Sequence, residues 1–170
     1  MVKKTLFFIT ATLLLILTQL TPADEHDLLM QGLDGQQHRL NDYIGKGQWV
    51  VVNVWATACP YCRRELFDLA SFHERHVESD AMVLGLTLDL ATFERPDKDH
   101  VERFASTYLI DYPLLLVSGD EASKVTGKNV HTVPMTFFYN PKGKMVYHFT
   151  GELDEVMLEG VIRLDPSIIK

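Results

Sequence analysis

The residues most able to do chemistry in this 170-residue chain are Cys59 and Cys62, its only two cysteines. They are separated by Pro60 and Tyr61 and stand where an apolar, β-branched run gives way to a helix-forming stretch. Two thiols three positions apart at a strand-to-helix junction are typical of a redox dithiol, which alternates between a disulfide and two free thiols. The spacing therefore predicts thiol–disulfide exchange.

The local sequence predicts different roles for the two sulfurs. Cys59 stands at the expected N-cap of a helix, and Pro60 takes the first helical position, where its missing N–H costs nothing. Free N–H groups and the positive dipole end of a helix stabilise a thiolate, so Cys59 is predicted to be the attacking sulfur. Cys62 lies one helical turn further on, and we expect it to resolve a mixed disulfide formed at Cys59.

A structural disulfide and half of a zinc site are the other interpretations of such a pair. Zinc needs four ligands, usually with a second cysteine pair or a close histidine pair, and the sequence has neither. A disulfide across two intervening residues closes a very short loop and stabilises weakly. We favour redox activity. The histidines at 73 and 76 have helical spacing, and a polar helix face explains them.

The N-terminus has the pattern of a secretory signal. Lysines precede an apolar stretch from Leu6 to Leu20, and small residues offer a cleavage site after Ala23. The apolar stretch is at the short end for crossing a bilayer, which takes about 20 residues. We expect residues 1–23 to be a cleaved signal peptide, with an uncleaved anchor as the alternative. Residues 24–170 then form one domain, in the periplasm or elsewhere outside the cytoplasm.

The charge of the chain limits its partners. It carries 16 basic and 23 acidic residues, a formal net charge of −7, and basic pairs such as Arg63-Arg64 are too short to offset this. An acidic surface argues against nucleic acid and anionic lipid as partners. We expect membrane contact only if the N-terminal segment is retained.

Hydrophobic patterns divide the mature chain into alternating strands and helices. Residues 50–55 and 81–88 have the apolar pattern of buried strands, and the helical stretch 63–76 between them predicts a parallel pair with a right-handed crossover. Other segments have helical spacing or hairpin patterns: helices at 99–108, 120–125 and 153–164, and hairpins at 28–40 and 136–149. The prediction is an α/β fold with a mixed sheet and helices on its faces.

Several of these stretches resemble the thioredoxin-like superfamily, and within it the extracytoplasmic TlpA/ResA-like thiol:disulfide oxidoreductases. The matching residues cover nearly the whole mature chain: 32–35, 52–59, 62–65, 132–138 and 140–144. The resemblance implies a thioredoxin-like mixed β-sheet flanked by helices, with an added N-terminal β-hairpin. It also implies a cis peptide bond before Pro134, in a loop beside the disulfide where the backbone of Val133 pairs with an extended substrate segment.

The chain departs from the family pattern in two informative places. Ala58 stands where many relatives have a tryptophan, which leaves substrate preference open. Asn53 stands where thioredoxins proper have a buried acid, and an amide cannot accept the proton that Cys62 must lose. Glu65, three residues after Cys62, is the candidate base, because similar proteins carry a glutamate there. A solvated acid in the first helical turn is the other interpretation of Glu65.

The resemblance implies an enzyme that exchanges disulfides with cysteines of protein substrates. Its catalytic residues would be Cys59, Cys62 and Glu65, and Tyr61, Val133 and Pro134 would contact substrate. No metal or dissociable cofactor is required. We favour the reducing direction, with a membrane thiol relay as electron donor and a role like that in cytochrome c maturation.

Two other functions are weighed against this one. A thiol peroxidase wants a threonine three residues before its reactive cysteine and a proline four residues further back, and this chain has Ala56 and Val52 there. A copper metallochaperone is favoured by two thiolates, which suit Cu(I), but that role usually wants a longer cysteine spacing and a nearby histidine. His131 is the one candidate for that histidine, and a solvated loop residue is its alternative interpretation.

Overall fold

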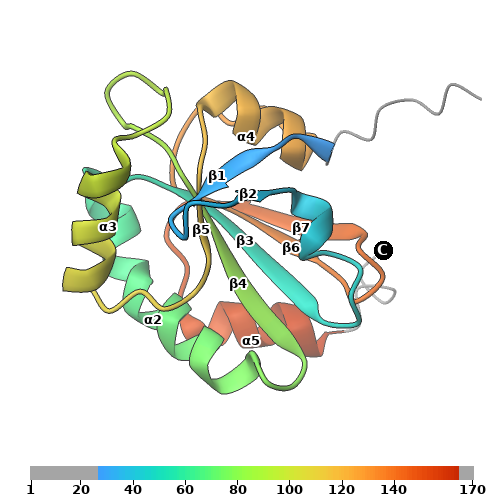
Figure 1. Cartoon of the computed structure of the whole chain (residues 1–170). Coiled ribbons are helices and arrows are strands. Elements are labelled where there is room, and N and C mark those ends of the chain that lie inside the picture. Colours follow the sequence, from blue (N-terminus) through green and yellow to red (C-terminus); the bar gives the residue numbers. More distant parts are fainter. Residues whose placement is uncertain (1–26, 165–170) are drawn as a thin grey trace, which may run out of the picture.

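A mixed sheet of seven strands lies at the centre of the computed structural model, which describes residues 27–164 (Figure 1). The strands are β1 (Met30–Gly32), β2 (Gln37–His38), β3 (Trp49–Trp55), β4 (Ala81–Thr87), β5 (Leu114–Leu116), β6 (Met135–Tyr139) and β7 (Met145–Thr150). The helices are α2 (Pro60–His76), α3 (Lys98–Thr107), α4 (Gly119–Thr126), α5 (Glu155–Arg163) and the 3₁₀ turn η3 (Leu40–Asp42). The strand order is β2-β1-β5-β4-β3-β6-β7.

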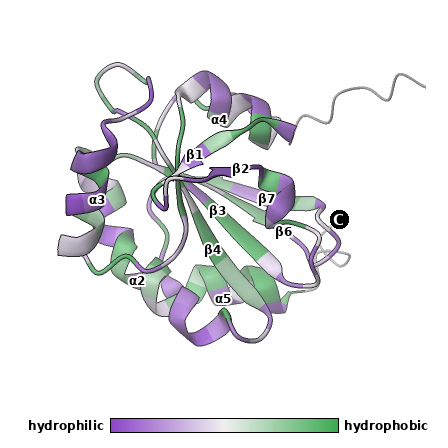
Figure 2. Cartoon of the chain, in the orientation of Figure 1, coloured by the Kyte–Doolittle hydropathy of each residue, from purple (hydrophilic) through white to green (hydrophobic). Residues whose placement is uncertain are grey.

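The two central strands are the most apolar part of the fold. β3 and β4 pair in parallel, from Trp49 opposite Ala81 to Trp55 opposite Thr87, and nearly all their residues are buried. Figure 2 shows both strands mostly green, whereas the helices carry green and purple stretches in alternation. β-Branched residues suit strands that are covered on both faces, so the predicted buried pair is confirmed.

Three helices, α2, α3 and α5, lie on one face of the sheet. β3, β4 and β5 are parallel neighbours joined by α2 and α3, and right-handed connections running in one direction put both helices on the same side. α5 packs beside α2, and α4 lies on the opposite face (Figure 1). The N-terminus of α2 therefore stands at the carboxyl end of β3, the strand beneath it.

Hairpins extend both edges of the sheet, as predicted. β1 and β2 are antiparallel, and their turn passes through Gly35, whose φ of +81° favours glycine. β6 lies antiparallel to β3 and continues through a turn into β7. The β6–β3 pairing matters for function, because it brings the chain just before β6 to the same sheet edge as the start of α2.

Two sequence-based expectations need correction. The last helix starts at Glu155 rather than at 153, because the Asp154 side chain caps it by accepting a hydrogen bond from the Met157 N–H, which leaves Leu153 outside the helix. His73 does not lie on a polar face: it is 6% exposed, and its Nδ1 accepts a hydrogen bond from the backbone N–H of Val83, 3.0 Å away.

The predicted signal peptide lies outside the described residues, and the predicted boundary of the domain at residue 24 does too. Both therefore remain predictions. Between residues 27 and 164, no helix is long and apolar enough to cross a membrane.

Candidate active site

Cys59 and Cys62 form a disulfide at the N-terminus of α2. Cys59 is the N-cap residue, with φ −84° and ψ 115°, and its Sγ accepts a hydrogen bond from the backbone N–H of Cys62 at 3.1 Å. Pro60 takes the first helical position, as predicted. The cap explains why the sequence folds this way: a sulfur replaces the usual oxygen acceptor for a free N–H of the first turn.

The two sulfurs differ in access. Cys59 keeps 3% of its surface exposed, whereas Cys62 has none. Ala58 and Pro60, on either side of Cys59, are exposed, and Tyr61 is 59% exposed. An external thiol therefore approaches the pair from the Cys59 side, and Cys62 faces the interior.

A second loop closes against the exposed side of the disulfide. The Val133–Pro134 peptide bond is cis, as the resemblance implies, and the carbonyl oxygen of Val133 lies 3.9 Å from the Sγ of Cys59. The loop is held there because β6 begins at the next residue, Met135, which pairs with Val54 near the end of β3. Val133 is partly exposed and Pro134 is buried.

Glu65 lies in the interior, not in solvent. It shares the inward face of α2 with Cys62 and is 0% exposed. Its Oε1 accepts a hydrogen bond from Nδ2 of Asn53 at 2.9 Å, and its Oε2 accepts one from the backbone N–H of Leu153 at 3.1 Å. Burial raises the pKa of Glu65 to about 7, against the lowering effect of these two hydrogen bonds. A carboxyl with this pKa can both accept and release a proton near neutral pH.

Asn53 joins Glu65 to the strand that follows the cis-proline loop. Its Nδ2 also donates to Oγ1 of Thr136 on β6, at 3.0 Å. The sequence predicts Asn53 as a satisfied polar residue of a buried strand, but only the amide nitrogen is satisfied: within residues 27–164 its Oδ1 has no hydrogen-bond partner. No role for Thr136 is predicted from the sequence, although a polar residue inside an apolar strand is a usable signal.

Two arginines flank the disulfide on the surface of α2. Arg64 forms an ion pair with Glu152 at 2.6 Å, and its guanidinium lies 4.5 Å from the centre of the Tyr61 ring. Arg63 points to the other side, where its Nε donates to the carbonyl of Thr57 at 2.8 Å.

A histidine also contacts Thr57, and the sequence alone does not predict that this histidine lies near the two cysteines. Nε2 of His100, on α3, lies 3.1 Å from Oγ1 of Thr57. His131, the histidine proposed as a copper ligand, is exposed, with its Nδ1 3.2 Å from the carbonyl of Asn129. Among the described residues, no group of three or more His, Cys, Asp or Glu side chains could hold a metal ion.

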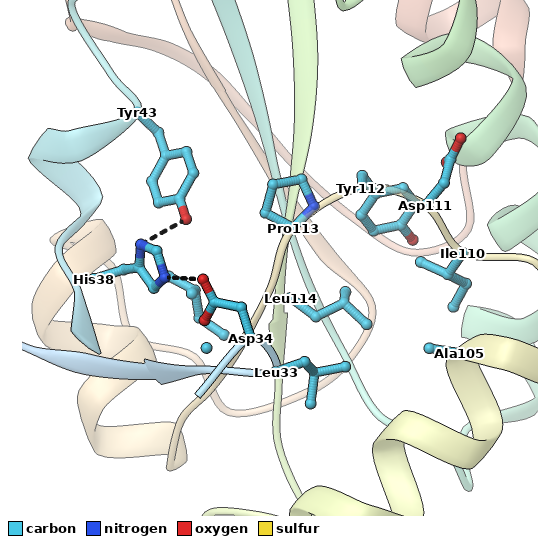
Figure 3. Close-up of a pocket in the computed structure, with 12 residues that line it drawn as sticks. Leu33, Asp34, His38, Tyr43, Ala105, Ile110, Asp111, Tyr112, Pro113 and Leu114 are labelled. Atoms are coloured by element: carbon cyan, nitrogen blue, oxygen red, sulfur yellow. Dashed lines mark hydrogen bonds and ion pairs between the residues drawn. The ribbon is translucent and has the colours of Figure 1, made fainter. Parts of the chain in front are cut away.

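A cavity of about 350 Å³ lies elsewhere, between the N-terminal hairpin and the segment that leads into β5 (Figure 3). On one wall, His38 stands between Asp34 and Tyr43, with its Nε2 2.9 Å from the Asp34 carboxylate and its Nδ1 3.1 Å from the Tyr43 hydroxyl. Neither cysteine lines this cavity, and neither does Glu65. It is separate from the disulfide.

The family model described as "AhpC/TSA family" matches residues 23–148. The chain belongs to the AhpC/TSA family. Among curated proteins similar to this chain, thiol-disulfide oxidoreductase ResA of Geobacillus thermodenitrificans is 28% identical over 127 residues, which cover 75% of this chain and 67% of ResA.

Solved structures support the same fold. A DsbF homologue from Corynebacterium diphtheriae superposes with a TM-score of 0.67 at 25% identity, covering 80% of this chain and 82% of the other. StoA from Bacillus subtilis gives a TM-score of 0.62 at 24% identity, covering 78% and 93%. The thioredoxin-like fold is confirmed. The disulfide and the ResA relatives together confirm the predicted class, a thiol:disulfide oxidoreductase with a Cys-x-x-Cys pair.

Proposed function

We propose that this protein reduces disulfides in protein substrates outside the cytoplasm, using Cys59 as the attacking sulfur and Cys62 as the resolving one. The observation that carries the proposal is the asymmetry of the pair: Cys59 caps a helix and keeps 3% of its surface exposed, whereas Cys62 has no exposed surface. The helix N-terminus stabilises a thiolate at Cys59, and burial shields a thiolate at Cys62 from external disulfides.

The reaction begins from the reduced protein. The Cys59 thiolate attacks one sulfur of a substrate disulfide, forms a mixed disulfide and expels the first substrate thiolate. Cys62 then loses its proton and attacks the Sγ of Cys59, which breaks the mixed disulfide and releases the second substrate thiolate. Two electrons pass from the dithiol to the substrate, both substrate thiolates become protonated, and the protein is left with the disulfide described above.

Glu65 takes the proton of Cys62 in this proposal. Its placement on the same inward face of α2 and its pKa of about 7 support the role. An ionised carboxylate accepts the proton before Cys62 attacks, and the protonated acid returns it to a leaving thiolate or to solvent. Asn53 and Leu153 hold the carboxyl in place through their hydrogen bonds.

The substrate segment lies along the cis-proline loop. The carbonyl of Val133 beside Cys59 supports backbone pairing with an extended segment, which would place a substrate cysteine over the reachable sulfur. Tyr61, exposed beside the disulfide, provides an aromatic contact for the same segment. Pro134 fixes the shape of the loop.

A location in the cell envelope is supported by the signal-like pattern of residues 1–23. A membrane thiol relay would return electrons to the Cys59–Cys62 disulfide, because the cycle ends with the protein oxidised. Reduction of haem-attachment cysteines, as in cytochrome c maturation, is the physiological role we favour.

Reduction of a peptide disulfide, with dithiothreitol as the electron source, tests the activity. Wild-type protein is expected to accelerate the reaction, and Cys59→Ser is expected to show none of this acceleration; equal rates would overturn the proposal. The midpoint potential of the Cys59/Cys62 couple tests the direction. A value near that of thioredoxin, about −270 mV, supports a reductant, and a value near that of DsbA, about −120 mV, reverses the assignment.

A further inference from the structure

Arg63 differs from most arginines of this protein because it has no acidic partner among residues 27–164. The others in the described part of the chain form ion pairs, with the exception of Arg103: Arg39, Arg64, Arg75, Arg95 and Arg163. Arg63 stands one helical turn from Cys59, at the edge of the surface that a substrate must meet. An unpaired guanidinium at that position is available to a binding partner.

The Arg63 side chain is nevertheless held in one orientation. Its Nε donates to the carbonyl of Thr57, two residues before Cys59, and its guanidinium lies 5.6 Å from the centre of the Phe104 ring. Phe104 is itself packed against Trp55 and stacked on Tyr108. In the described residues nothing bonds to the terminal Nη groups of Arg63. A guanidinium that is already oriented loses little conformational entropy when it binds, and its fork of N–H donors matches a carboxylate.

We propose that Arg63 binds a carboxylate of the substrate close to the reacting cysteine, so that the preferred substrates are protein disulfides flanked by Asp or Glu. The inference rests on the proposed function and specifies its substrate class. The proposed preference is opposite to the one expected from the electrostatic field of the whole protein, because a chain of net charge −7 repels acidic segments and attracts basic ones. Preference for an acidic flank is therefore the signature of a local contact with Arg63.

The test compares two synthetic peptides that differ only beside the cysteines of an intramolecular disulfide, one with aspartates and one with lysines at the flanking positions. Rates of reduction by the pre-reduced protein are measured by stopped flow. Each rate is divided by that variant's rate with the neutral compound 2-hydroxyethyl disulfide, so that changes in the intrinsic reactivity of Cys59 cancel. Wild type is expected to prefer the aspartate peptide by about threefold, the size of one exposed charge pair. Arg63→Gln is expected to prefer the lysine peptide.

Arg103→Gln is the matched control, because it removes the same charge from another arginine without an acidic partner. It is expected to keep the wild-type preference. A wild-type preference for the lysine peptide overturns the proposal, and so does an equal loss of preference in Arg63→Gln and Arg103→Gln, which indicates a general field. If wild type fails to reduce 2-hydroxyethyl disulfide, the proposed function itself falls, and this inference falls with it.

Discussion

Nδ2 of Asn53 lies 2.9 Å from Oε1 of Glu65, so a strand amide stabilises the ionised form of a buried helix carboxyl. This hydrogen bond lowers the pKa of Glu65 against the larger effect of burial, which raises it. The acid of this pair stands on α2, three residues after Cys62, and its amide partner stands on β3.

Replacing Asn53 tests this relationship. Asn53→Ala removes the donor, so the pKa of Glu65 should rise further, and the rise of the Cys62 step with pH should move to higher pH. Loss of buried hydrogen bonds should also cost about 1–3 kcal/mol of unfolding free energy. Thr136→Val is the control, since it removes only the acceptor on β6 and leaves the Asn53–Glu65 bond. If the pH–rate profile shifts equally in Asn53→Ala and Thr136→Val, the Asn53 hydrogen bond is not what lowers the pKa of Glu65.

Glu65→Gln should alter the pH dependence of substrate release. In wild type, the Cys62 step should accelerate as pH rises through about 7, where Glu65 becomes ionised and able to accept a proton. The glutamine variant should lack this rise and be slower above pH 7, by about 10²–10⁴-fold if proton transfer limits the step. The rate of the Cys62 step is measured as the single-turnover decay of a mixed disulfide at pH values from 5 to 9. An identical profile in both proteins refutes a base at position 65.

The same carboxyl should make stability depend on pH. Its folded pKa of about 7 lies above the ordinary glutamate value of 4.5, so the folded protein binds the proton more tightly than the unfolded chain. This stability is fully present below pH 4.5 and is lost as pH rises through 7. The loss is about 3 kcal/mol. Urea denaturation at pH 4 and pH 8 measures the free energy of unfolding. This free energy should decrease less between the two pH values for Glu65→Gln than for wild type. Parallel decreases would show that other groups dominate.

Gly85 on β4 should not tolerate a side chain. A Cβ there would stand 2.4 Å from Cδ2 of Leu114 and 3.0 Å from Nε1 of Trp55, in the packed face beneath the active site. Gly85→Ala should therefore destabilise the protein by about 1–3 kcal/mol, measured by chemical denaturation. Gly160→Ala is the matched control: Gly160 lies in α5 with no atom near its would-be Cβ, so alanine should stabilise by about 0.5–1 kcal/mol. Equal effects would contradict the packing described here.

The sequence predicts the scaffold of the site because local signals define it. A β-branched run at 50–55 followed by a cysteine cap and Pro60 predicts a buried strand that leads into a helix, and the structure agrees. The cis bond at Pro134 was predictable only through the family resemblance, since local chemistry favours trans.

Contacts between distant segments were not predictable in the same way. The buried carboxyl of Glu65 accepts a hydrogen bond from the backbone N–H of Leu153, 88 residues away, which local sequence does not predict. His73 looked polar by spacing alone, yet its ring bonds the backbone of Val83. The contact of Arg63 with Phe104 likewise depends on how α3 packs against α2. Helical spacing predicts which face of a helix a residue occupies. It does not predict which distant segment packs against that face.

The most direct measurement of the central claim is mass spectrometry of trapped intermediates. Reduced Cys62→Ser and Cys59→Ser proteins are each mixed with a peptide disulfide, quenched with acid and mapped. Cys62→Ser should accumulate the peptide as a mixed disulfide on Cys59, because the resolving thiol is missing. Cys59→Ser should carry almost none on the buried Cys62. Comparable labelling of both sulfurs, or labelling of Cys62 alone, would contradict an attacking Cys59 resolved by Cys62.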